Sequence, residues 1–179
     1  KAAPNFQKEI LKVEHLTVKN NNGFDVVKDV SFCIRGGEIF AIAGVSGNGQ
    51  VEIADAIAGL CKVHSGKIYL NGKDITNESI RKRTLDGISY IPEDRHHYVM
   101  DFTLNGNIAL KDYFKEPFSK RGILQQKEFE SYGEKLIKKY DVRSGQGGKT
   151  IVRSMSGGNQ QKAIIAREIE LQSPLMIFV

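Results

Sequence analysis

A glycine-rich segment near the start of the chain has the residue types needed to hold a phosphate group. It follows the frame G-x-x-x-x-G and lies between an apolar run, residues 38–43, and residues 52–60, whose apolar side chains recur at helical spacing. Glycines let successive backbone N–H groups converge on phosphate oxygens, and the start of the next helix adds its positive dipole end. The predicted phosphate-binding residues are Gly44, Val45, Ser46, Gly47, Asn48, Gly49, Gln50 and Val51.

Two positions of this segment depart from the standard phosphate loop. A lysine normally follows the second glycine and reaches the terminal phosphates, and a Ser or Thr hydroxyl then binds Mg²⁺. Here Gln50 is uncharged and Val51 has no side-chain oxygen. We therefore expect a backbone cradle without the charge that assists phosphoryl transfer and without a side-chain metal ligand. For the loop taken alone, the alternative is a strand-to-helix turn that binds nothing.

A second candidate motif, MSGGNQQK, occupies residues 155–162. Ser156 is well placed to cap a helix, and Gly157 and Gly158 allow an anion to approach the backbone closely. Asn159 and Gln160 follow as candidate nucleotide contacts. Taken alone, Ser-Gly-Gly is also typical of a flexible turn, but its combination with the upstream loop is specific.

The elements that must position these motifs alternate between strands and helices. Period-two and short apolar runs predict strands over residues 10–18, 26–34, 38–43, 66–72, 87–92 and 175–179. Helical spacing and capping signals predict helices over residues 52–60, 79–85, 103–110, 126–140 and 156–171. We expect an α/β domain over residues 9–179 with a mixed sheet core and an antiparallel β subdomain. Residues 1–8 read as a linker, a helical subdomain is inserted at about 94–155, and residues 144–149 form a flexible stretch.

Composition narrows the classes of function. Of 179 residues, 40% are hydrophobic, and no apolar run approaches the ~20 residues that cross a bilayer. No signal peptide is evident, so we expect the chain in the cytosol or at a membrane through a partner. The net charge is +5, but the basic residues are scattered, and the small cluster at 81–83 predicts a solvated face rather than a nucleic-acid site. Cys33 and Cys61 are predicted to be reduced core residues, and no metal site is predicted.

Together the two motifs resemble those of the ABC ATPases, whose signature motif is of LSGGQ type. Three segments are similar to the second domain of tandem importer ATPases for simple sugars and nucleosides: GVSGNGQ, YIPEDRHHYVMDFTLNGNIAL and SMSGGNQQKAIIARE. The GNGQ form most resembles the nucleoside-type (BMP-associated) branch. The resemblance covers nearly the whole chain, from about residue 10 to residue 179, and implies a P-loop NTPase fold of ABC type.

The resemblance assigns further roles. Glu93 stands where most members have the Q-loop glutamine, which senses Mg²⁺ and the attacking water. Tyr98, Met100 and Phe102 would meet the coupling helix of a permease, with core packing as the alternative. Phe24 is the candidate for stacking on adenine, with a strand core position as the alternative. His96 and His97 are expected at the surface rather than as metal ligands.

The resemblance also implies a mechanism and partners. ABC domains work as head-to-tail dimers, with ATP between one phosphate loop and the partner's signature motif. Ser156, Gly157 and Gly158 would thus act in trans, completing the site of an N-terminal ABC domain of the same polypeptide. The implied cofactors are ATP or ADP, with Mg²⁺ in the full transporter. The implied partners are permease subunits and, indirectly, a substrate-binding lipoprotein, at the cytoplasmic face of the membrane.

Other expectations concern the end of the sequence and the competing functions. The Walker B acid, D-loop and switch histidine of the family are not among these 179 residues. We therefore expect an incomplete domain, whose apolar edge favours self-association. Two alternative functions remain: a non-catalytic nucleotide-binding scaffold or regulatory module, and a cytosolic ABC protein that acts on ribosomes or nucleic acid.

Overall fold

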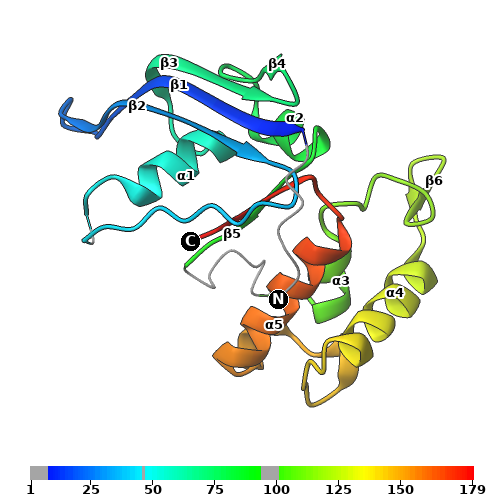
Figure 1. The fold of residues 1–179 in the computed structure, drawn as a ribbon. Helices are drawn as coiled ribbons and strands as arrows, with labels where there is room; N and C mark the ends of the chain where they lie inside the picture. The colour runs from blue at the N-terminus through cyan, green and yellow to red at the C-terminus, as the bar shows by residue number, and fades with distance from the viewer. Residues whose placement is uncertain (1–7, 46, 94–100) are drawn as a thin grey trace. The chain divides into compact units, whose positions relative to one another are not determined.

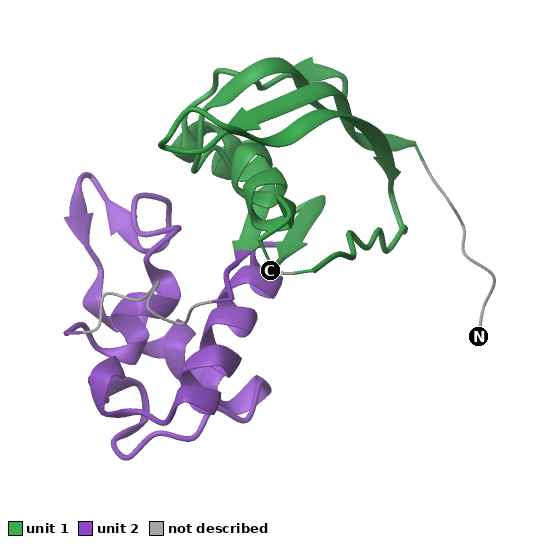
Figure 2. Ribbon diagram, turned by 90° about the vertical axis from the view of Figure 1, so that its left-hand side faces the viewer, with its two compact units in different colours: residues 1–90, 173–179 green, residues 91–172 purple. Residues whose placement is uncertain are grey.

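The computed structural model describes residues 8–45, 47–93 and 101–179, which form two compact units (Figure 2). Unit 1 comprises residues 1–90 and 173–179, and unit 2 comprises residues 91–172. The range of unit 2 includes the predicted helical subdomain of about 94–155. The predicted linker, residues 1–8, lies almost entirely outside the described residues.

Unit 1 contains a four-stranded antiparallel sheet in the order β2-β1-β3-β4 (Figure 1). Its strands are β1 (Glu9–Lys19), β2 (Asp25–Arg35), β3 (Val63–Leu70) and β4 (Lys73–Asp74). In β1, Val13 and Leu16 are both buried although they are three residues apart. A register shift between them, with His15 at φ 52°, adds the extra residue of a β-bulge. The predicted antiparallel subdomain is confirmed.

Helix α1 (Gln50–Ala58) buries Ile53, Ala56 and Ile57 in the core of unit 1, as its apolar spacing predicts. Its C-terminus is held by Arg83, from α2 (Ile80–Leu85). The Arg83 guanidinium donates to the carbonyl oxygens of Ala56 and Ile57 at 2.5 and 2.8 Å, and the residue is 2% exposed. The prediction that this basic cluster is a solvated face is therefore wrong for Arg83, because the helix end needs donors for its free carbonyl groups.

The predicted strand over residues 87–92 is β5 (Ile88–Ile91), and the apolar terminal run is β8 (Leu175–Phe178). These two strands pair with each other in a two-stranded sheet. Next to them, the Ser89 and Ser173 hydroxyls lie 2.7 Å apart, and the Tyr90 hydroxyl donates to Asp55 of α1 at 2.6 Å. Strand β5 is therefore anchored to α1, the helix that follows the glycine-rich loop.

The prediction of a buried strand over residues 38–43 is wrong. No strand is assigned there, and Ile39, Phe40 and Ile42 are 99%, 41% and 43% exposed. Strand assignment requires a hydrogen-bonded neighbour, and within the described residues no strand pairs with this segment. Phe40 does stack on Phe32 of β2, with ring centroids 4.9 Å apart. The self-association predicted for an apolar sheet edge stays a prediction.

Unit 2 is built mainly from helices α3 (Leu104–Ala109), α4 (Gln126–Lys139) and α5 (Gly157–Glu170). It also has a short hairpin of β6 (Ser119–Lys120) and β7 (Ile123–Leu124). The 3-10 helices η2 (Gly147–Lys149) and η3 (Val152–Ser154) connect α4 to α5. The stretch predicted to be flexible, residues 144–149, contains η2, and the Gly148 N–H donates to Glu134 Oε1 at 2.8 Å. Its flexibility stays a prediction.

Charged side chains are buried inside unit 2. Glu168 of α5 is fully buried and accepts from Lys111 Nζ at 2.6 Å and from Arg167 Nε at 2.9 Å. Burial lowers the pKa of Lys111, although the Glu168 carboxylate opposes this effect. Of the two cysteines predicted in the core, Cys61 packs against the core of unit 1 and Cys33 does not. Cys33 is exposed because it faces outward on β2, and Cys61 is half-buried; both are free thiols.

Candidate functional site

The glycine-rich loop of unit 1 joins the exposed segment 38–43 to α1. Gly47 and Gly49 have φ angles of 88° and 94°, in the left-handed region that favours glycine. Gly49 is the N-cap of α1, and a Cβ at this position would lie 2.5 Å from the Val26 carbonyl oxygen of β2. Strand β2 therefore sets the position of the loop. Ser46, which was predicted to bind phosphate, lies outside the described residues.

The side chain of Gln50 folds back onto the start of this loop. Its Nε2 donates to the Val45 carbonyl oxygen at 3.2 Å. A Cβ on Gly44 would lie only 2.0 Å from the same nitrogen, so the amide occupies the space beside Gly44. The residue that replaces the usual lysine thus bonds to the loop itself instead of projecting as a charged group.

The loop fits a phosphate better than it fits a metal ion. The first N–H groups of α1 have no partner within the helix, and the helix dipole favours an anion there. Val51 is 43% exposed and offers no oxygen to Mg²⁺. Among the described residues, no group of three or more His, Cys, Asp or Glu side chains is placed to hold a metal. The arrangement can hold a phosphate through its backbone but supplies no side-chain cation or metal ligand.

The remaining predicted contacts lie at different places. Phe24 is 70% exposed at the turn before β2, so its alternative reading as a strand core residue is wrong. Glu93 is exposed and follows β5 after Pro92. Phe102 is 51% exposed before α3, whereas Tyr98 and Met100 lie outside the described residues, as do His96 and His97.

The second motif lies at the N-terminus of α5 in unit 2. Ser156 is the N-cap, as predicted, but its side chain makes no cap hydrogen bond to the helix backbone. The N–H groups of Gly157 and Gly158 open the helix, where backbone donors have no intrahelical partner. A Cβ on Gly158 would meet nothing within 4 Å. The hydroxyl and the two N–H groups together can donate to an anion.

Asn159 and Gln160 both make hydrogen bonds inside unit 2. Asn159 Oδ1 accepts from the Arg143 N–H at 2.9 Å, and its Nδ2 donates to Ser156 Oγ at 2.9 Å. Gln160 is 5% exposed and donates to the Val152 carbonyl oxygen at 2.9 Å. Their predicted contact with nucleotide stays a prediction, and these amides first serve to order the motif.

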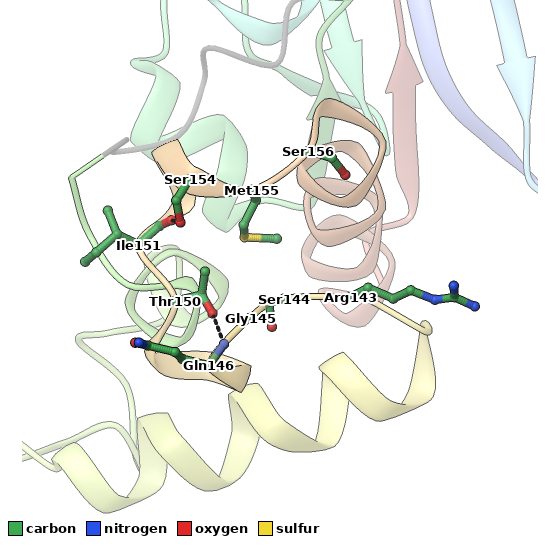
Figure 3. A pocket seen from close by; sticks show the side chains of 9 residues that line it. All are labelled: Arg143, Ser144, Gly145, Gln146, Thr150, Ile151, Ser154, Met155 and Ser156. Atoms are coloured by element: carbon green, nitrogen blue, oxygen red, sulfur yellow. Dashed lines mark hydrogen bonds between the residues drawn. The ribbon is translucent and has the colours of Figure 1, made fainter.

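A cavity of about 650 Å³ lies beside this motif and was not predicted from the sequence (Figure 3). Its lining residues come from the loop after α4 and from the segment that leads into α5: Arg143, Ser144, Gly145, Gln146, Thr150, Ile151, Ser154, Met155 and Ser156. The Arg143 side chain points away from the other lining residues in Figure 3. The volume is within the range of about 300–1,000 Å³ that small-molecule sites occupy.

Comparison with known proteins connects the two motifs. The sequence model of the ABC transporter family matches residues 27–178, a range that contains the phosphate loop and the α5 motif. The chain belongs to the ABC transporter family. The resemblance to the ABC ATPases is thereby confirmed, and the assignment of the α5 motif as the signature motif stays a prediction.

Individual relatives of the ABC domain are import ATP-binding proteins. The chain is 47% identical over 171 residues to a guanosine import ATP-binding protein of Bacillus subtilis, covering 94% of this chain and 33% of that protein. It is 45% identical over 179 residues to a nucleoside import ATP-binding protein of Lactococcus lactis, covering 99% and 35%. A ribose import ATP-binding protein of Clostridium tetani is 36% identical over 170 residues, covering 94% and 32%. The chain thus spans about a third of the length of these relatives.

Solved structures show the same fold. A nucleotide-free ATP-binding cassette from an ABC transporter superposes with a TM-score of 0.75 at 20% identity, covering 96% of this chain and 68% of that one. A dimeric cassette in a post-hydrolysis state with ADP and phosphate bound gives 0.78 at 22% identity, covering 94% and 73%. The predicted fold class, a P-loop NTPase of ABC type, is confirmed. Within the described residues, no helix of the ABC domain is both long and apolar enough to span a bilayer.

Proposed function

We propose that the chain is the ATP-binding domain of an ABC importer in which binding and catalysis are divided. Its own phosphate loop holds nucleotide without efficient hydrolysis, and its signature motif completes the ATP site of a partner domain. The observation that carries this proposal is the contrast between Gln50, whose amide bonds to its own loop, and Ser156, whose hydroxyl makes no backbone cap. Glu93, at the Q-loop position, is part of the weakened site.

The loss of catalysis at the loop follows from charge. A lysine and a bound Mg²⁺ normally stabilise the charge that develops on the transferring phosphoryl group. Neither Gln50 nor Val51 replaces them, and loss of one preorganised donor lowers the rate by about 100-fold or more. The backbone donors at Gly49 and the exposed ring of Phe24 remain available to bind ATP or ADP.

The proposed partners follow from this division of nucleotide binding and catalysis between two domains. The relatives are about three times longer than this chain, which leaves room for a second ABC domain in one polypeptide. We propose an intact N-terminal ABC domain as the owner of the catalytic site, with permease subunits and a substrate-binding lipoprotein completing the importer at the cytoplasmic face of the membrane. The names of these relatives, which are guanosine, nucleoside and ribose import proteins, support nucleosides as cargo, with simple sugars as the other candidate.

Two ATPase assays test this division. The isolated domain should bind nucleotide but hydrolyse ATP at least about 100-fold more slowly than the full protein. In the full protein with its permease, Ser156→Ala should lower the rate by about 100-fold. Mg²⁺-dependent turnover by the isolated domain at the rate of the full protein would contradict the weakened loop. Unchanged turnover of the Ser156→Ala protein would contradict the role in trans.

A non-catalytic scaffold is the second candidate, and the closed Gln50 amide favours it. In that case the domain binds nucleotide and supports its partner mechanically, without a chemical role for the signature. The Ser156→Ala assay separates the candidates, because a scaffold would keep full activity when one exposed hydroxyl is removed.

A further inference from the structure

The signature serine differs from the other capping hydroxyls of this chain. Ser79 Oγ accepts from the Lys82 N–H at the start of α2, and Thr103 Oγ1 accepts from the Gly106 N–H at the start of α3. Both are ordinary helix caps. At α5 the Asn159 N–H, which holds the same position in its helix as the Lys82 and Gly106 N–H groups, instead donates to the carbonyl oxygen of Ser156 at 3.0 Å. The Ser156 hydroxyl is therefore released from backbone capping.

Within residues 101–179, the hydroxyl of Ser156 has one hydrogen-bond partner, the side chain of Asn159. The orientation of this amide is fixed by chemistry. Asn159 Oδ1 faces the backbone N–H of Arg143 at 2.9 Å, and a backbone N–H can only donate. The other end of the amide, Nδ2, must then donate to Ser156 Oγ at 2.9 Å.

This arrangement fixes the role of the Ser156 proton. A hydroxyl carries one proton and two lone pairs, and Nδ2 uses one of the lone pairs. The O–H is thus not needed for Asn159 and is left to donate elsewhere. The Gly157 and Gly158 N–H groups lie at the same helix end, so an oxygen of an approaching anion would meet three donors.

We propose that Asn159 is a positioning residue of the signature motif, which holds the Ser156 hydroxyl as an acceptor so that its proton is presented to phosphate. The proposal rests on the proposed role of Ser156 in trans. It also explains the departure from the usual glutamine at this position. Asparagine is one methylene shorter, and its amide spans the short distance between Ser156 and the loop at Arg143.

Lys162 makes a second contact from α5 to the loop that contains Arg143, and this contact supplies a matched control. Lys162, one turn further along α5, donates to the carbonyl oxygen of Asp141 at 2.9 Å and lies 3.1 Å from its carboxylate. This ammonium, together with the Arg143 guanidinium, holds the pKa of the Asp141 carboxyl below its ordinary value. Lys162 thus ties the loop to α5, as Asn159 does, but no contact joins it to Ser156. Lys162→Met therefore tests tethering alone.

The experiment is a double-mutant cycle in the full protein with its permease, reading kcat and KM for ATP and the melting temperature. Asn159→Ala should lower kcat by about 10-fold, the scale of one hydrogen bond, and Ser156→Ala by about 100-fold. Their combination should be no slower than Ser156→Ala alone, because Asn159 acts through Ser156. Asn159→Asp should fall as far as Ser156→Ala, because a carboxylate cannot donate and would draw the hydroxyl proton inward.

Each result supports or contradicts the proposal. Lys162→Met should keep kcat within about twofold, since an exposed ion pair contributes little. Multiplicative losses in the double mutant, or equal losses in Asn159→Ala and Lys162→Met, would overturn the positioning role and show that Asn159 only tethers the loop. If Ser156→Ala itself keeps full activity, the proposed function fails first.

Discussion

The phosphate loop and the signature motif are both glycine-containing starts of helices, but they use glycine for different reasons. At Gly49 a side chain would strike the Val26 carbonyl oxygen, so the packing of this chain itself requires glycine. At Gly158 a side chain would meet nothing within 4 Å. The polar neighbours differ too, since Gln50 bonds to its own loop and Asn159 supports a hydroxyl. At the first motif the polar side chain bonds to its own loop, and at the second a hydroxyl and open space remain for a group outside the chain.

The largest effect on ATPase activity is expected from a long side chain at position 156, beside the open space at Gly158. In the full protein, Ser156→Arg should abolish ATPase activity, a fall of more than about 100-fold, because the long side chain occupies the place of the phosphate. The fold should persist, because Ser156 is exposed and makes no cap bond. Gln161→Arg places the same side chain on an exposed position of α5 and should retain activity. Retained ATPase activity of the Ser156→Arg protein would contradict the view that the α5 motif leaves its open space for a ligand.

A smaller change at Gly158 tests whether the glycine serves a ligand. Gly158→Ala should lower kcat in the full protein by about 10-fold, since a methyl group displaces phosphate by a fraction of its contact distance. The melting temperature should not fall, because the added Cβ has open space and alanine favours helix by up to about 1 kcal/mol. A lower melting temperature at unchanged kcat would show that the glycine is structural.

Restoring charge should make the first motif resemble a catalytic loop. Gln50→Lys should tighten ATP binding to the isolated domain by about 10-fold through a charge-assisted contact, as measured by nucleotide titration. Adding Val51→Thr should make binding depend on Mg²⁺, whereas the native domain should bind equally well after chelation. Gln50→Ala is the control, because it removes the bond to Val45 without adding charge. Equal affinities for the alanine and lysine variants would contradict the charge argument.

The smallest effect is expected at Phe24. Phe24→Ala should weaken ATP binding to the isolated domain by about fivefold, from loss of roughly 1 kcal/mol of stacking on the base. The ring is 70% exposed, so the melting temperature should hold. Inorganic triphosphate, which has no base, should bind the variant and the native domain alike. If the substitution weakened the binding of ATP and of triphosphate equally, Phe24 would not contact the base.

Much of this molecule follows from local pattern. Alternation in β1 and β2, the helices predicted over residues 79–85 and 103–110, and the apolar spacing of α1 all appear in the structure. The strand expected at 38–43 failed because apolar runs report burial only when a partner strand is present. Contacts between residues far apart in the sequence could not be predicted either. No spacing rule reveals that Arg83 serves the carbonyls of α1 27 residues earlier, or that Lys111 meets Glu168 57 residues later.

The positions of the motif glycines were easier to predict than the bonding of the side chains around them. The glycines of the two motifs lie at the starts of α1 and α5, as their frames predict, while their contact with nucleotide stays a prediction. Residue type does not say where an amide points. Gln50 and Asn159 were both read as groups that face nucleotide, and both make bonds within the protein that depend on a neighbouring carbonyl or N–H. The cavity beside Ser156 depends on the path of the loop after α4, which no motif records.

The contact between Gly44 and Gln50 makes the residue at one position depend on the residue at the other. The amide fits because position 44 has no side chain, and an alanine there would meet Nε2 at 2.0 Å. The far end of a glutamine is flexible, so the alanine would expel the amide rather than unfold the loop. The closed position of the Gln50 amide is therefore open only to a chain with glycine at position 44.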